Sequence, residues 1–223
     1  MTAIFAYADS EVAFVASDTK RETSGYQTVA CKTTRWSENI IISQTGHGEG
    51  LQRLVGEMLA WQHRDPKMLT GAGVVHAFKQ LAANRLTAEI GMLKHPANAP
   101  TVSGTLVVVE AQRGGLPGTI FTLDWVKQTQ VAQPGPVYAD GTDQPAFFAI
   151  AQAKFSSMGP GGSGFDLAAW GLSCIDQAKA HKNGAAVDWP ADLTICRPDN
   201  GVLVSVVQRA AGPSSATHPL FVI

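Results

Sequence analysis

The stretch that decides the fold is MTAIFAYADSEVAFVASDTK, residues 1–20. Apolar, aromatic and small residues fill 2–8 and 11–17, and the polar pair Asp9-Ser10 separates them, which predicts a β-hairpin. The second strand ends at Asp18. Because most chains fray at their first residues, a strand that begins at Thr2 indicates one of two things. Either this residue is pinned in a core sheet, or it is itself the reactive group.

Composition limits the classes of protein that the chain can belong to. A length of 223 residues favours one large domain, which can bury a sufficient core without disulfides. Lys and Arg total 17 against 18 for Asp and Glu, so nothing indicates a nucleic-acid or membrane-surface partner. Hydrophobic residues make up 45% and charged residues only 16%. We therefore expect another subunit to cover some of the surface.

The metal-binding and redox-active residue types form no recognisable site. Cys31, Cys174 and Cys196 are far apart and odd in number, which favours neither zinc nor a disulfide framework. The six histidines lack metal-ligand spacing, so we expect no metal and no cofactor. Residues 1–17 lack a signal-peptide pattern, and no apolar run approaches the roughly 18 residues of a membrane helix. We therefore expect a cytoplasmic protein.

The hydrophobic period changes several times along the chain. Residues 48–63 and 74–95 have apolar side chains at helical spacing, and 165–181 predicts a third helix. The expected strands are 28–36, 39–46, 104–112, 118–126, 146–155, 192–198 and 201–210, with an irregular segment at 133–145 and a glycine loop at 158–164. Runs of strands separated by helices favour an α+β fold with two antiparallel sheets and helices outside them. The NIII and LVVV runs predict strands buried on both faces.

Three residues near the start of the chain can cooperate chemically. If Met1 is removed, Thr2 has a free α-amine beside its hydroxyl, and such an amine can act as the base that activates the hydroxyl. Lys32 would stabilise the alkoxide, and Asp18 would hold the lysine charged and in place. The alternative reading is structural for each residue: an inert N-terminal threonine, a turn aspartate and a solvated strand lysine.

A competing motif lies in the last third of the chain. The segment GPGGSG, residues 159–164, formally matches the dinucleotide-binding pattern G-x-G-x-x-G. No βαβ unit surrounds it, and a proline occupies its second position. A loop before a helix is the better interpretation.

The ordered set of Thr2, Asp18, Thr23 with Gly25, Lys32 and Gly46 resembles the proteasome β-subunit family, and the bacterial HslV-type peptidases most closely. The order of elements is similar over most of residues 2–207, whereas the specific motifs lie mainly in the first 50 residues. The resemblance implies an N-terminal-nucleophile (Ntn) hydrolase fold, a four-layer α-β-β-α sandwich. It also implies a single domain over 1–223 with a variable tail from about 211.

The resemblance implies catalytic roles for four of these residues. The Thr2 hydroxyl would be the nucleophile and its α-amine the base. Lys32 would lower the effective pKa of that hydroxyl, and Asp18 would orient Lys32. The backbone N–H of Gly46 would donate to the oxyanion.

Other residues would support the amine and bind the substrate. Ser163, in a Gly-Ser-Gly turn, would hydrogen-bond near the amine of Thr2, and Ser156 and Ser157 are the alternatives to it. Thr23 and Gly48 would line a cleft that binds the peptide by strand-like pairing.

The implied function is a threonine endopeptidase of a self-compartmentalising double ring of hexamers or heptamers. Its substrates would be peptides or unfolded proteins, and an ATPase unfoldase is a candidate partner. Two alternatives stay open: a catalytically inactive ring that is structural or binds peptides, and an Ntn amidohydrolase that acts on a small amide.

Overall fold

A computed structural model describes most of the chain. The described residues are 2–23, 26–29, 31–92, 102–112, 115–158, 166–184, 187–199 and 202–210. Ser163, the GPGGSG motif and the expected tail lie outside these residues.

The described residues form twelve strands, four α-helices and one short 3₁₀ helix. The strands are β1 Ala3–Ala8, β2 Ala13–Asp18, β3 Lys20–Thr23, β4 Tyr26–Val29, β5 Thr33–Arg35, β6 Ile40–Gly46, β7 Gly104–Glu110, β8 Thr119–Asp124, β9 Thr129–Gln133, β10 Val137–Gly141, β11 Ala191–Asp199 and β12 Val202–Ala210. The helices are α1 Gly48–Gln62, α2 Gly71–Met92, α3 Gln144–Ser157 and α4 Leu167–Ala180, and the 3₁₀ helix is η1 Pro66–Met68. None of these helices is long and apolar enough to cross a membrane.

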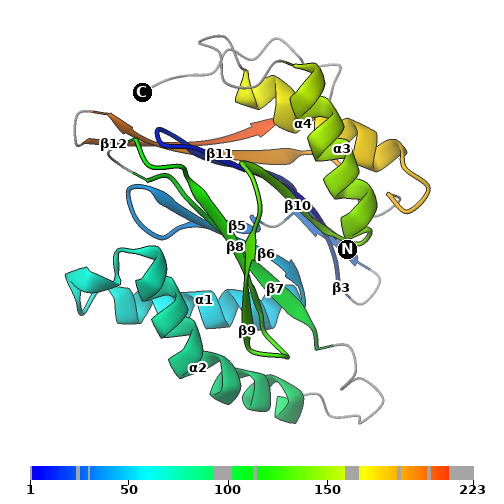
Figure 1. The fold of residues 1–223 in the computed structure, drawn as a ribbon. Coiled ribbons are helices and arrows are strands. Elements are labelled where there is room, and N and C mark those ends of the chain that lie inside the picture. Colours follow the sequence, from blue (N-terminus) through cyan, green and yellow to red (C-terminus); the bar gives the residue numbers. More distant parts are fainter. Residues whose placement is uncertain are drawn as a thin grey trace.

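The strands make two five-stranded antiparallel sheets (Figure 1). The first has the order β10-β1-β2-β11-β12 and the second the order β5-β6-β7-β8-β9, while β3 and β4 form a separate ribbon. The N-terminal strand β1 lies between β2 and β10 and pairs with both. These sheets confirm the predicted α+β fold and the predicted hairpin of the first 18 residues.

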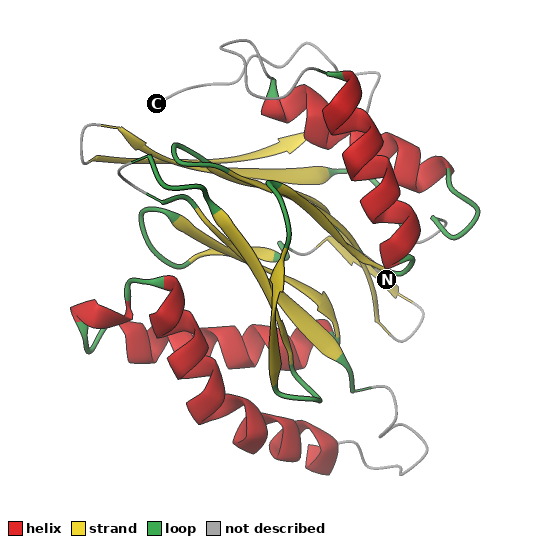
Figure 2. Ribbon diagram, in the orientation of Figure 1, coloured by secondary structure: helices red, strands yellow, loops and turns green. Residues whose placement is uncertain are grey.

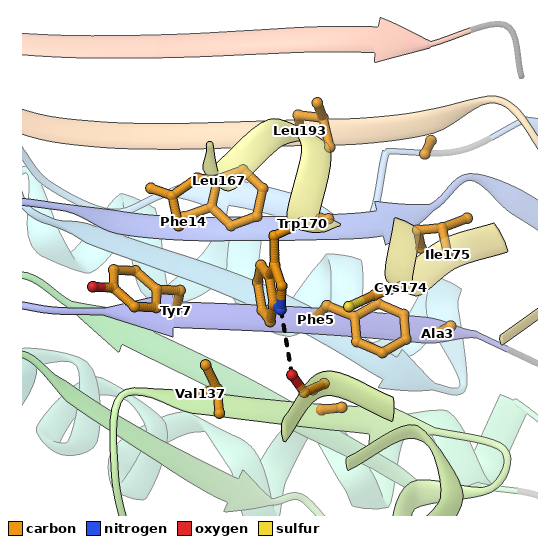
Figure 3. Close-up of a cluster of buried hydrophobic side chains, with 14 of the residues drawn as sticks. Ala3, Phe5, Tyr7, Phe14, Val137, Leu167, Trp170, Cys174, Ile175 and Leu193 are labelled. Carbon is orange, nitrogen blue, oxygen red and sulfur yellow. Dashed lines mark hydrogen bonds between the residues drawn. The ribbon is translucent and has the colours of Figure 1, made fainter. Parts of the chain in front are cut away.

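The helices pack on the sheets in two pairs. Figure 2 shows α3 and α4 beside the first sheet and α1 and α2 beside the second. Fully buried Trp170 is at the centre of the cluster between α3, α4 and the first sheet, and its indole N–H donates to the carbonyl of Ala151 at 3.3 Å (Figure 3). Trp125 has the matching position under α2, where its indole N–H donates to the carbonyl of Ala82 at 3.0 Å.

The two sheets also bury side chains against each other. Ile4 and Val15 of the first sheet share a cluster with Ile41, Val107 and Val109 of the second. The alternate residues of the same β6 and β7 strands pack under α1 and α2. Both faces of these strands are therefore buried, as the NIII and LVVV runs predicted.

Three of the sequence predictions are wrong. The segment predicted to be irregular, 133–145, contains the regular strand β10. The segment predicted as a strand, 146–155, lies inside helix α3, because Phe147, Ile150 and Ala151 face the core at helical spacing. Short apolar runs are ambiguous between the two periods. The predicted strand 28–36 is divided between β4 and β5, which belong to different sheets.

Candidate active site

Thr2 lies directly before β1 and is buried, with an exposed fraction of 7%. Its carbonyl accepts a hydrogen bond from the backbone N–H of Thr142 at 3.2 Å, which continues the pairing of β1 with β10. Gly141 has a φ of +140°, and a Cβ at this position would collide with the carbonyl oxygen of Thr2. Only glycine fits there, so the close approach of β10 holds the first strand at its N-terminal end.

Asp18 and Lys32 meet beside this end of β1. Asp18 is fully buried at the end of β2, and its Oδ1 accepts hydrogen bonds from the Ala3 backbone N–H at 2.7 Å and from Lys32 Nζ at 2.9 Å. Burial raises the pKa of Asp18, while Lys32 and the Ala3 N–H act in the opposite direction. The aspartate thus joins the lysine to the residue that follows Thr2.

Gly46 ends β6 and begins the turn into α1. Its φ is +102°, and a Cβ would collide with the carbonyl of Ser103 and the Cα of Gly104. The next residue, His47, donates its backbone N–H to the Ser103 carbonyl at 2.7 Å. The Gly46 backbone is exposed, and Gly48 follows as the first residue of α1.

A buried carboxylate of α2, Glu89, binds α1 close after this turn. Glu89 is 2% exposed, and its two oxygens each accept a hydrogen bond of 2.7 Å from the Arg53 guanidinium. His47 Nε2 lies 3.8 Å from the same carboxylate. The hydrogen bonds from Arg53 hold the pKa of Glu89 below its usual range. Glu89 therefore connects the N-terminal half of α1, which follows the Gly46 turn, to α2.

Thr2 opens onto a cleft of about 630 Å³. Its described lining comes from the end of β6 (residues 45–46), the start of β7 and the two residues before it (102–105), the β8–β9 turn (124, 126 and 127) and the end of β10 with Thr142 (140–142). Both Thr2 and Gly46 line this cleft. In the described part of the chain, no group of three His, Cys, Asp or Glu residues could hold a metal ion.

The two alternatives to Ser163 lie far from Thr2, and Ser163 itself lies outside the described residues. Ser156 and Ser157 are exposed at the end of α3, about 20 Å along the helix from its start beside Thr142. Thr23 ends β3 and pairs with Tyr26 in the β3–β4 ribbon.

Two polar residues beside Thr2 were missed by the sequence analysis, Asp140 and Thr142. The expected order of strand, glycine turn and helix, which was placed around Ser163, is found instead at β10, Gly141-Thr142-Asp143 and α3. The sequence feature that could have located this turn is YADG followed by Asp143 and Pro145, since an aspartate with a proline shortly after it is typical of a helix start.

Comparisons with known proteins identify the fold. One similar solved structure is the Anbu (Gly-1) mutant from Hyphomicrobium sp. strain MC1, with a TM-score of 0.68 and 12% identity over 97% of this chain and 90% of that one. Another is Anbu (ancestral beta-subunit) from Yersinia bercovieri, with a TM-score of 0.66 and 12% identity over 95% of this chain and 88% of that one. No family model and no curated protein matches the sequence.

These matches correct the family assignment. The sequence was expected to belong with the proteasome β-subunits and, most closely, the HslV-type peptidases, and that assignment is wrong. The matching structures are Anbu proteins, one of which is named an ancestral beta-subunit. At 12% identity the likeness establishes the fold alone.

Proposed function

We propose that the chain is an N-terminal threonine peptidase of a proteasome-like homo-oligomeric ring, with Thr2 as its nucleophile after removal of Met1. The observation that carries this proposal is the buried Asp18, which accepts hydrogen bonds from both Lys32 and the backbone N–H of Ala3. A buried ion pair at the very start of a core strand has a high desolvation cost. Positioning a lysine beside a reactive residue is a function that explains this cost.

The proposed reaction is an acyl transfer in two steps. The α-amine of Thr2 takes the proton of the Thr2 hydroxyl as its oxygen attacks the peptide carbonyl carbon. The resulting tetrahedral intermediate collapses, the peptide C–N bond breaks, and the α-amine returns the proton to the leaving nitrogen. Water, deprotonated by the same amine, then hydrolyses the acyl ester and restores the hydroxyl. Lys32 stabilises the negative charge that develops on the Thr2 oxygen.

The turn at Gly46 would supply the electrostatic stabilisation of the carbonyl oxygen. An exposed backbone with a positive φ, held between Ser103 and α1, suits an N–H donor that must not reorganise during the reaction. We also propose that the substrate runs along the β3 backbone near Thr23 and passes Gly48.

The assembly is part of the same proposal. A single domain with the four-layer α-β-β-α arrangement of the Ntn hydrolases would form closed rings, with the sites inside. The likeness to Anbu, one of whose structures is named an ancestral beta-subunit, supports this assembly. Enclosure would limit access to peptides and unfolded chains, and an ATPase unfoldase would be a suitable partner.

The test is intact mass spectrometry before and after incubation with a peptide α′,β′-epoxyketone, a reagent that requires a hydroxyl and a free α-amine on one residue. We expect loss of the Met1 mass and one adduct per chain. Thr2→Ala should give no adduct, whereas Thr2→Ser should still react. A retained Met1 with no adduct would exclude the proposed nucleophile and favour a catalytically inactive ring.

A further inference from the structure

The cleft beside Thr2 is lined by a buried carboxylate, Asp140. It is 9% exposed, and its oxygens accept hydrogen bonds from the Thr45 hydroxyl at 2.9 Å and from the Gly141 backbone N–H at 2.8 Å. Both donors are neutral. In the described part of the chain, no lysine, arginine or histidine forms an ion pair with Asp140, whereas Asp18 has Lys32. Buried charges are costly unless they are paired, so a positive group bound in the cleft would stabilise Asp140.

The strand register places this carboxylate close to the proposed nucleophile. Gly141 pairs with Ala3, and the Thr142 N–H bonds to the carbonyl of Thr2. Asp140 is therefore the diagonal neighbour of Thr2 across the two strands, on the same face of the sheet, at a typical separation of about 7–8 Å. Both residues line the cleft. A substrate group bound next to the scissile bond can reach Asp140.

The other charges of the described lining cancel each other. Asp124 and Lys127 lie at its mouth with an Nζ–Oδ2 distance of 3.5 Å, and Lys127 is 76% exposed. Asp140 thus leaves the described lining with a net negative charge. Two valines, Val102 and Val126, also line the cleft. A lysine or arginine side chain suits this lining, because its aliphatic stem can pack on the two valines and its charged end can reach Asp140.

The position of the cleft indicates which part of the substrate it takes. Its described lining comes from β6, β7, the β8–β9 turn and β10. The substrate of the proposed peptidase runs along β3, and with its acyl part there its leaving part lies in the cleft beside Asp140. We propose that Asp140 is a specificity-determining residue that selects lysine or arginine immediately after the scissile bond. This inference rests on the proposed peptidase function.

The experiment compares quenched fluorescent peptides that are identical except for Lys, Ala or Glu directly after the cleaved bond. We expect kcat/KM for the Lys peptide to exceed that for the Glu peptide by about tenfold or more, the scale of one partly buried charge pair. Asp140→Asn should abolish the ranking, while Asp65→Asn, an exposed carboxylate that caps η1, should preserve it. The comparison among peptides with the unmodified protein tests the proposal even if Asp140→Asn does not fold.

The outcomes separate this inference from the proposed function. If the epoxyketone labels Thr2 but the three peptides are cleaved at equal rates, the selectivity of Asp140 is refuted and the peptidase is retained. If no labelling occurs, the proposed function itself fails. If Asp140→Asn slows labelling by the epoxyketone, which has no leaving peptide, Asp140 acts on the Thr2 amine and not on the substrate, which also overturns the inference.

Discussion

Replacing Lys32 by methionine tests the central electrostatic argument. Lys32 is 8% exposed and its Nζ lies 2.9 Å from the Oδ1 of fully buried Asp18. The other oxygen, Asp18 Oδ2, accepts no hydrogen bond among the described residues. The variant would keep the aliphatic stem and remove the charge. Asp18 would then be a buried carboxylate whose one remaining donor is the Ala3 N–H.

The magnitude follows from two independent estimates. Removal of one partner from a buried ion pair costs about 3–5 kcal/mol. The alternative for the variant is to bind a proton, and neutralising a carboxyl of ordinary pKa at pH 7 costs about 4 kcal/mol. For a chain of this length, the resulting loss of stability is a fall in Tm of roughly 6–20 °C.

The pH dependence has a definite sign. Burial already raises the pKa of Asp18, and loss of Lys32 would raise it further. A carboxyl with a raised pKa in the folded state binds more protons when folded, so stability rises as the pH falls toward its unfolded pKa. The penalty of Lys32→Met should therefore be largest at neutral pH and shrink by about 1.4 kcal/mol per pH unit below it.

The assay is thermal and denaturant unfolding from pH 7 to pH 4.5 at one fixed protomer concentration, because assembly would otherwise shift the apparent stability. Lys127→Met, at an exposed ion pair, is the matched control and should change stability by no more than about 0.5 kcal/mol. Adding Asp18→Asn to Lys32→Met should recover part of the loss. A penalty that is independent of pH, or two substitutions whose effects simply add, would refute the reasoning.

Two further substitutions test the turn at the site. Gly46→Ala should destabilise the protein by about 2–5 kcal/mol and abolish epoxyketone labelling, because it combines a positive φ with a collision against Ser103. The control is Gly56→Ala, where an added Cβ meets nothing within 4 Å, and it should stabilise by about 0.5–1 kcal/mol. Equal changes in the free energy of unfolding at both glycines, measured by denaturant unfolding, would contradict the proposed strain at Gly46. Glu89→Gln should cost about 1–3 kcal/mol at pH 7, measured in the same way. Because the pKa of Glu89 is lowered in the folded state, the stability that its carboxylate provides is present above its unfolded pKa and is lost as the pH falls through its folded pKa. A stability difference between the wild type and Glu89→Gln that widens in acid would therefore be inconsistent with the Arg53 pair.

Much of the local structure could be predicted because it depends on neighbours in the chain. The apolar runs at 2–8 and 11–17, separated by a polar turn, predicted the β1–β2 hairpin. The runs at 40–42 and 106–109 predicted strands buried on both faces. Helical spacing predicted α1 and most of α2. Asp18 and Lys32 could be predicted as partners because both follow closely on Thr2 in an ordered motif.

The β10–α3 segment could not be predicted in the same way. Residues 146–155 are almost uniformly apolar, so they carry neither period clearly, and the helix forms because Phe147, Ile150 and Ala151 pack against the first sheet. Once this segment was read as a strand, the real strand before it was read as irregular. The turn at Gly141-Thr142 and its contact with Thr2 were missed as a consequence.

The sequence by itself determined the α+β class and the N-terminal hairpin, and it predicted Thr2, Asp18 and Lys32 as a cooperating set. Only the tertiary structure decided that β10 pairs with β1 and places Asp140 in the cleft beside Thr2. The physical reason is that the pairing of strands far apart in the chain depends on which faces the sheets and helices bury together. The local hydrophobic periodicity of one strand does not specify its distant partner. The position of a buried carboxylate relative to a nucleophile is likewise a property of strand register.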